Sequence, residues 1–178
     1  MRMAHVAPVL VILATTAAAI AEGTSDPFAP LRRLEGRWRG RGDGQPGRSS
    51  MERSYTFVLG QRFLQVRNTS VYPVQEKNPK GEVHEDLGMF SYDRTRKKLV
   101  LRQFHVEGFV NQYVLAQARP DGNELVFVTE SIENVPAGFR ARETYRFIGA
   151  DELEEVFELA EPNKEFELYS RANLTRVK

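Results

Sequence analysis

The stretch from Gly36 to Gly44 constrains the fold more than any other, because its residue types alternate with a period of two. The even-numbered positions are Gly36, Trp38, Gly40, Gly42 and Gly44. The odd-numbered positions between them are all arginines except Asp43. This alternation predicts a β-strand with one charged, solvated face. Glycine weakens a strand, so the row of glycines indicates close approach of another backbone, as where a strand bends inside a small barrel.

A flexible Gly/Arg loop that binds nucleic acid is the alternative interpretation of this stretch. Arginine and glycine would not need to segregate by parity in such a loop, and here they do. Apart from Arg2, the chain carries equal numbers of basic and acidic residues. A surface with balanced charge does not indicate nucleic acid or an anionic membrane as a partner.

Two features that the sequence lacks limit the kinds of chemical site that the chain can contain. The chain has no cysteine, which excludes disulfide bonds, zinc sites with cysteine ligands and thiol nucleophiles. It also lacks Gly-x-Ser-x-Gly, a phosphate-binding loop and His-Glu-x-x-His. The sequence therefore predicts no catalytic residues.

Residues 1–21 are typical of a secretory signal peptide. A short basic start precedes an apolar run from Val6, which ends in Ala19-Ile20-Ala21, a cleavage site of the A-x-A type. The run is shorter than the roughly 20 residues that a transmembrane helix needs. The prediction is an exported protein, periplasmic or extracellular, that begins near Glu22; an uncleaved membrane anchor is the alternative.

The remaining chain is organised as one β domain. Residues 22–33 form a lead-in with a short helical turn that includes Phe28 and Leu31, and residues 34–178 contain about ten alternating segments separated by turn signals. Short connections favour up-and-down order, and pairing of the first strand with the last removes exposed sheet edges. We therefore expect an all-β, antiparallel up-and-down barrel of about ten strands, with room for one small ligand.

The glycine-rich strand resembles a known superfamily. Gly36-x-Trp38 is similar to the calycin signature of lipocalins and fatty-acid-binding proteins. The longer pattern through Gly44, with Gly88-Met-Phe-Ser-Tyr-Asp93 before a hairpin, resembles nitrobindin, a haem-binding ten-stranded barrel, and related bacterial barrels of unknown function. The resemblance implies that Arg176, or less favourably Arg171, packs on Trp38 and closes the barrel floor.

The resemblance also implies haem, ligated by a histidine near the last strand. Residues 165–178 contain no histidine, so the chain departs from that pattern. Tyr169 shares its parity with Glu165, Glu167 and Arg171, which predicts that it faces outward. The cofactor is therefore left open, with haem as one alternative.

Polar residues on the otherwise apolar inner faces are the candidate ligand contacts. The predicted ligand-binding residues are Arg53, Tyr55, His105, Asn111, Glu143 and Tyr145. Two interpretations of the inward charges remain open, because a buried charge must be paired or hydrated. Arg53 and Glu143 could form an internal ion pair, or Arg53 and Tyr55 could receive an anionic head group.

His84 and His105 lie in one predicted hairpin. If Tyr92 pairs with Lys97, the two histidines face each other across the strands. Facing histidines can bind zinc or haem iron, but the sequence shows no clear third ligand. The prediction is no metal, with His84 and His105 as the alternative site.

The predicted function is binding of one small apolar or amphipathic ligand inside an exported barrel. An enzyme that uses the interior as its pocket is a second hypothesis, with Glu143 and His105 as a conceivable acid–base pair. A barrel filled by its own side chains, acting as a structural or interaction module, is a third. The bulky residues behind that third hypothesis are Phe57, Phe63, Phe127, Phe147, Phe157 and Phe166.

Overall fold

The computed structural model describes residues 26–178. The predicted signal peptide lies outside the described residues. Within residues 26–178, no helix has the length and apolarity needed to cross a membrane.

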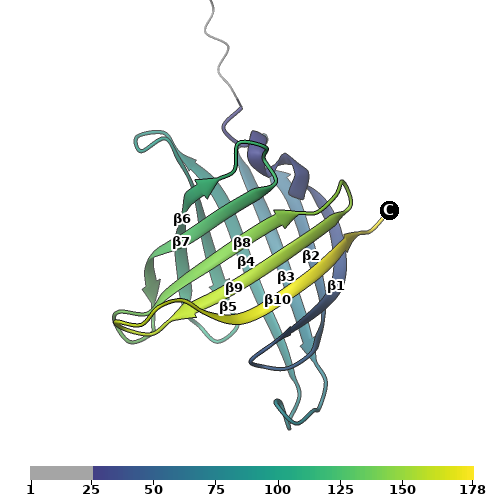
Figure 1. The fold of residues 1–178 in the computed structure, drawn as a ribbon. Helices are drawn as coiled ribbons and strands as arrows, with labels where there is room; N and C mark the ends of the chain where they lie inside the picture. Colours follow the sequence, from purple (N-terminus) through teal and green to yellow (C-terminus); the bar gives the residue numbers. More distant parts are fainter. Residues whose placement is uncertain (1–25) are drawn as a thin grey trace, which may run out of the picture.

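The described chain folds into ten antiparallel strands that close into one barrel (Figure 1). Each strand pairs with its neighbours in sequence, and β1 also pairs with β10. The strands are β1 (Gly36–Gly44), β2 (Ser49–Val58), β3 (Phe63–Tyr72), β4 (Glu82–Asp93), β5 (Lys98–His105), β6 (Val110–Ala118), β7 (Glu124–Glu133), β8 (Arg140–Phe147), β9 (Glu152–Ala160) and β10 (Glu167–Arg176). The predicted all-β, ten-stranded up-and-down barrel is confirmed.

Strand β1 closes the barrel because its glycines allow close approach of β10. Gly40 lies opposite Leu174, and a Cβ atom on Gly40 would sit 1.9 Å from the backbone oxygen of Asn173. A Cβ on Gly44 would meet the backbone oxygen of Tyr169 at 2.1 Å. The alternative of a flexible Gly/Arg loop is therefore wrong: the stretch is a strand paired on both sides.

One end of the barrel is plugged by the 3₁₀ helix η1 (Ala29–Leu34), which Figure 1 shows lying over that end. Leu31, Leu34 and Trp38 are fully buried there. The Trp38 ring donates its Nε1–H to the backbone oxygen of Leu34 at 2.7 Å, and the Arg176 guanidinium lies 4.1 Å from the ring centre. Trp38 is thus a structural floor residue held by a hydrogen bond and a cation–π contact.

The interior is packed only in the half next to η1. Phe90, Phe127 and Tyr145 meet edge to face with ring centres 5.5–6.2 Å apart, which fills the middle of the barrel. The other half encloses a cavity of about 450 Å³. The filled-barrel hypothesis is therefore wrong for this half. One of its phenylalanines, Phe166, lies against the guanidinium groups of Arg140 and Arg142 instead.

Candidate functional site: a cavity with a two-histidine, one-aspartate mouth

The cavity lies in the half of the barrel opposite η1. Its volume of about 450 Å³ falls within the range of roughly 300–1,000 Å³ that is typical of small-molecule sites. Five of the six predicted ligand residues line it: Arg53, His105, Asn111, Glu143 and Tyr145. Tyr55 does not, because it is buried behind the cavity wall with its hydroxyl bonded to Glu155 at 2.8 Å.

Arg53 is neutralised by a carboxylate from β9, which β1 and β10 separate from β2 in the barrel. Its Nε lies 3.0 Å from Glu155 Oε2, and both side chains are buried. The remaining N–H groups reach the Thr69 backbone oxygen and the Ser70 hydroxyl. Burial alone would lower the pKa of Arg53, but the charges of Glu155 and Asp86 outweigh it and raise the pKa.

This pairing corrects one of the two interpretations of Arg53. Its partner is Glu155 of β9 rather than Glu143 of β8, and parity within one strand does not reveal which inward carboxyl group lies nearer. Arg53 and Tyr55 already share the Glu155 carboxylate. Most donors of Arg53 and Tyr55 are therefore already bonded within the protein, and Arg53 Nη2 contacts the Met51 sulfur at 3.4 Å.

Glu143 is the unpaired carboxyl group of the interior. Its side chain lines the cavity, whereas the ion pair with Arg53 and the hydrogen bond from Tyr55 are made by Glu155 instead. Burial raises its pKa well above the ordinary value, and the nearby Glu155 charge raises it further, against the opposing effect of Arg53. A neutral carboxylic acid at this position can donate as well as accept a hydrogen bond.

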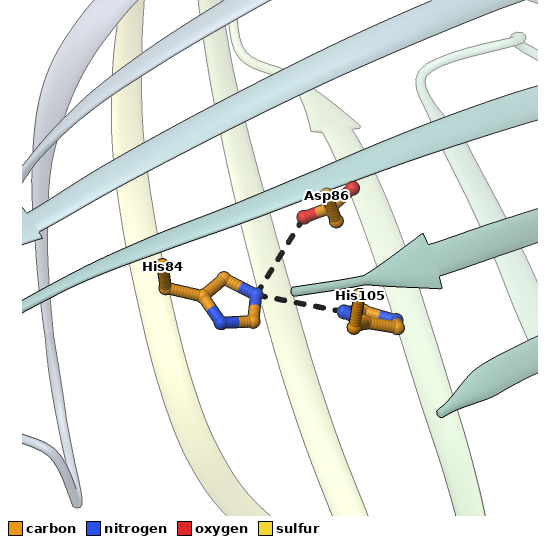
Figure 2. A group of neighbouring side chains, drawn as sticks. All are labelled: His84, Asp86 and His105. Carbon is orange, nitrogen blue, oxygen red and sulfur yellow. Dashed lines mark hydrogen bonds and ion pairs between the residues drawn. The ribbon is translucent and has the colours of Figure 1, made fainter. Parts of the chain in front are cut away.

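Strands β4 and β5 bring three metal-ligating side chains together at the mouth of the cavity. The turn between these strands is longer than predicted, so Tyr92 pairs with Leu99 and Asp86, rather than His84, lies opposite His105. The observed register differs from the predicted one by two residues, so every side chain stays on the predicted face of its strand. Figure 2 shows His84 between Asp86 and His105, with both contacts made from one ring nitrogen.

The distances within this group are short. His84 Nε2 lies 3.7 Å from Asp86 Oδ2 and 3.5 Å from His105 Nδ1. Burial, then the neighbouring His84, lowers the pKa of His105 to about 4. Burial also raises the pKa of Asp86 to about 6, although Arg53 and His84 oppose this. Asp86 is not assigned as a ligand from the sequence, although its position two residues after His84 places both side chains on one face.

Tyr169 also lines the cavity mouth, contrary to its predicted outward orientation. The pairing of β10 with β9 shifts between Leu168 and Ser170, and Tyr169 is the extra residue of this bulge. A bulge breaks the alternation of side chains, so the parity rule fails at this position.

The charge of the cavity is strongly one-sided. Among the described residues that line it, five carry carboxyl groups and one carries a guanidinium. The carboxyl groups belong to Glu82, Asp86, Glu107, Glu143 and Glu155, and the guanidinium to Arg53. This environment favours cations and disfavours anions.

A closed ten-stranded antiparallel barrel with an internal cavity of this size is a barrel of the calycin type. The chain belongs to the family described as "THAP4-like, heme-binding beta-barrel domain", whose sequence model matches residues 27–176. The resemblance to nitrobindin-like barrels is therefore confirmed.

The fold is shared with a solved protein. The crystal structure of Rv2717c from M. tuberculosis has a TM-score of 0.68 and 22% identity, and the match covers 86% of this chain and 99% of that one. A redesigned β-barrel, b11L5F_LGL, matches at a TM-score of 0.41 and 9% identity over 82% of this chain and 93% of its own, and adds nothing to the argument. No match was found among curated protein sequences.

The residues of this cavity do not fit haem iron held by two histidines. His84 Nε2 and His105 Nδ1 approach each other to 3.5 Å beside a carboxylate, so only one of them could ligate the iron of a porphyrin. Tyr169 is a further candidate ligand, but burial and then Glu82 and Glu107 raise its pKa and disfavour the phenolate. The carboxyl-rich lining also disfavours the two propionates of haem.

Proposed function

We propose that this protein binds a small amphipathic molecule with an uncharged polar group, held in the open half of the barrel. The observation that carries the proposal is the cavity itself, with its closed Arg53–Glu155 pair and with Glu143, whose pKa burial raises. The proposal contains no catalytic step.

The lining of the cavity offers both the apolar and the neutral polar groups that such a ligand needs. Apolar side chains of the outer half would contact the hydrocarbon part: Phe109, Ile132, Val135, Phe139, Phe157 and Leu159. Neutral donors and acceptors from Asn111, Glu143 and Tyr145 line the same space. A hydroxyl, carbonyl or amide can hydrogen-bond to these groups, and a carboxylate would meet neighbouring carboxyl groups without a free cation.

A titration with the uncharged fluorescent probe N-phenyl-1-naphthylamine tests the proposal. We expect saturable binding of one equivalent with a dissociation constant of about micromolar order. Decanol should displace the probe at least about tenfold more effectively than decanoate, because the carboxylate loses its hydration without gaining a partner. Absence of saturable binding, or preference for decanoate, would contradict the proposal.

The site of binding is tested by filling the cavity. Ala172 is buried in β10 and lines the cavity, so Ala172→Leu should weaken probe binding about tenfold by occupying ligand space. Ala118 is exposed at the end of β6, and Ala118→Leu is the matched control that should leave binding unchanged. Equal binding by both variants would place the probe elsewhere.

We also propose that the chain is exported, on the basis of the apolar run and the cleavage motif at Ala19–Ala21. Expression of the full chain in a bacterial host should give a periplasmic or secreted product whose intact mass corresponds to a start at Glu22. A product that retains residues 1–21 in the membrane fraction would support the uncleaved anchor instead.

A further inference from the structure

We propose that His84, Asp86 and His105 bind one divalent transition-metal ion of the Zn²⁺ or Fe²⁺ type, without porphyrin, at the mouth of the cavity. Each of the three residues offers one ligand atom, and these atoms lie within 4.8 Å of one another. The contacts of His84 Nε2 with Asp86 Oδ2 and His105 Nδ1 indicate these three atoms as the ligands. This site is separate from the binding of the amphipathic ligand, and either can exist without the other.

The separations of the ligand atoms fit a bare ion. Metal–nitrogen and metal–oxygen bonds of about 2.0–2.2 Å place two ligand atoms of a tetrahedral site roughly 3.3–3.6 Å apart. The observed separations from His84 Nε2 are 3.5 Å to His105 Nδ1 and 3.7 Å to Asp86 Oδ2. The three ligand atoms all lie within 4.8 Å of one another, so side-chain shifts of about 1 Å or less would complete the geometry.

In two of the three proposed ligands, the polar atom that does not face the metal is hydrogen-bonded to a neighbouring group, as is usual in metal sites. His84 Nδ1 lies 2.7 Å from Glu107, which orients the ring and leaves Nε2 free. Asp86 Oδ1 accepts hydrogen bonds from Asn68 at 2.8 Å and Gln103 at 3.3 Å, which leaves Oδ2 free. Such outer partners fix the orientation and the protonation of the ligands.

Asn111 is the group that orients the ring of His105. Its amide nitrogen lies 3.3 Å from His105 Nε2, and its amide oxygen is buried without a partner among the described residues. An amide turned over by half a rotation keeps its shape and places the oxygen against His105 Nε2 and the Tyr113 hydroxyl. Both then donate to that oxygen, and His105 Nδ1 presents its lone pair to a metal.

The chemical types of the three proposed ligands determine which metal ions the site favours. Two imidazoles and one carboxylate suit zinc and ferrous iron, and leave at least one coordination position open. All three side chains line the cavity, so an open position faces its interior. The surrounding carboxyl groups supply the negative potential that a dication requires.

Titration of chelator-treated protein with Co²⁺ tests the site without any assay of activity. We expect one equivalent to bind with visible d–d absorption, and Zn²⁺ to displace it. Asp86→Asn keeps the shape of the side chain but removes its charge, and should lower Co²⁺ affinity by at least about 100-fold. Glu85→Gln is the matched control, because Glu85 is exposed on the opposite face of β4 and should bind Co²⁺ as the wild type does.

A second variant covers the outcome in which Asp86→Asn unfolds. Glu107 is half exposed at the rim, so Glu107→Gln should fold and weaken Co²⁺ binding about 10–100-fold through His84 alone. Absence of saturable Co²⁺ binding, or equal affinity in wild type, Asp86→Asn and Glu107→Gln, would overturn the proposal. Naphthylamine binding by folded Asp86→Asn protein should persist, which separates a failed metal site from a failed ligand cavity.

Discussion

A Glu155→Gln variant is expected to lose about 3–5 kcal/mol of unfolding free energy, because it removes one partner of a buried ion pair and leaves the other charged. Arg53 and Glu155 are each less than one-tenth exposed, and their contact at 3.0 Å joins β2 to β9 across the cavity. The Tyr55 hydroxyl also loses its charged acceptor. Urea unfolding at pH 7, followed by the fluorescence of the sole tryptophan, Trp38, measures the loss.

Glu143→Gln is the matched control, because the same substitution in the same cavity should have the opposite effect. Glu143 is protonated in the folded protein at pH values where the unfolded chain has already ionised, since its folded pKa is raised. The wild type therefore loses stability as the pH rises above the unfolded value of about 4.3. Glutamine does not titrate, so the variant should gain stability relative to wild type as the pH rises above about 4.

The two variants together distinguish a paired carboxylate from a neutral one. Equal losses in Glu155→Gln and Glu143→Gln would show that both carboxyl groups are paired, contrary to the structure. A stability difference between Glu143→Gln and wild type that does not change with pH would show that Glu143 keeps an ordinary pKa.

Gly40→Ala is expected to lower the unfolding free energy by about 3 kcal/mol or more, because a close backbone contact leaves no space for the methyl group. The added Cβ would lie 1.9 Å from the Asn173 oxygen, and backbone cannot move aside as a flexible side chain can. The β1–β10 seam that closes the barrel would therefore separate locally. Urea unfolding and protection of β10 amides from hydrogen exchange measure the effect.

Gly149→Ala is the control for this substitution. The nearest atom to its added Cβ is 4.0 Å away, so the change should stay within about 0.5 kcal/mol of wild type. A Gly40→Ala protein as stable as Gly149→Ala would refute the role assigned to the glycine row.

Much of the fold could be predicted because alternation in a strand reports directly on burial. The parity of Gly36–Gly44 predicted a strand, and the short turns predicted up-and-down closure of β1 on β10. The inward orientation of Arg53 and Glu143 followed from the same rule. These features depend on local pattern, which a sequence displays.

The contacts within the candidate site could not be predicted, because they depend on which distant segments meet in the folded barrel. Parity shows that Arg53 points inward, but the identity of its partner depends on which inward carboxyl group lies nearer. The His84–His105 register depended on the length of one turn, and the placement of Tyr169 depended on one bulge. Asp86 joined the two histidines only when the register was known.

The central claim is that the open half of the barrel is a ligand site and the half under η1 is a packed floor. Amide chemical-shift mapping during titration with N-phenyl-1-naphthylamine tests it most directly. We predict the largest shifts at cavity-lining positions of β5, β6, β8 and β10, and no significant shift at Leu31, Leu34 or Trp38. Shifts centred on η1, or scattered over the outer faces of the strands, would contradict this account.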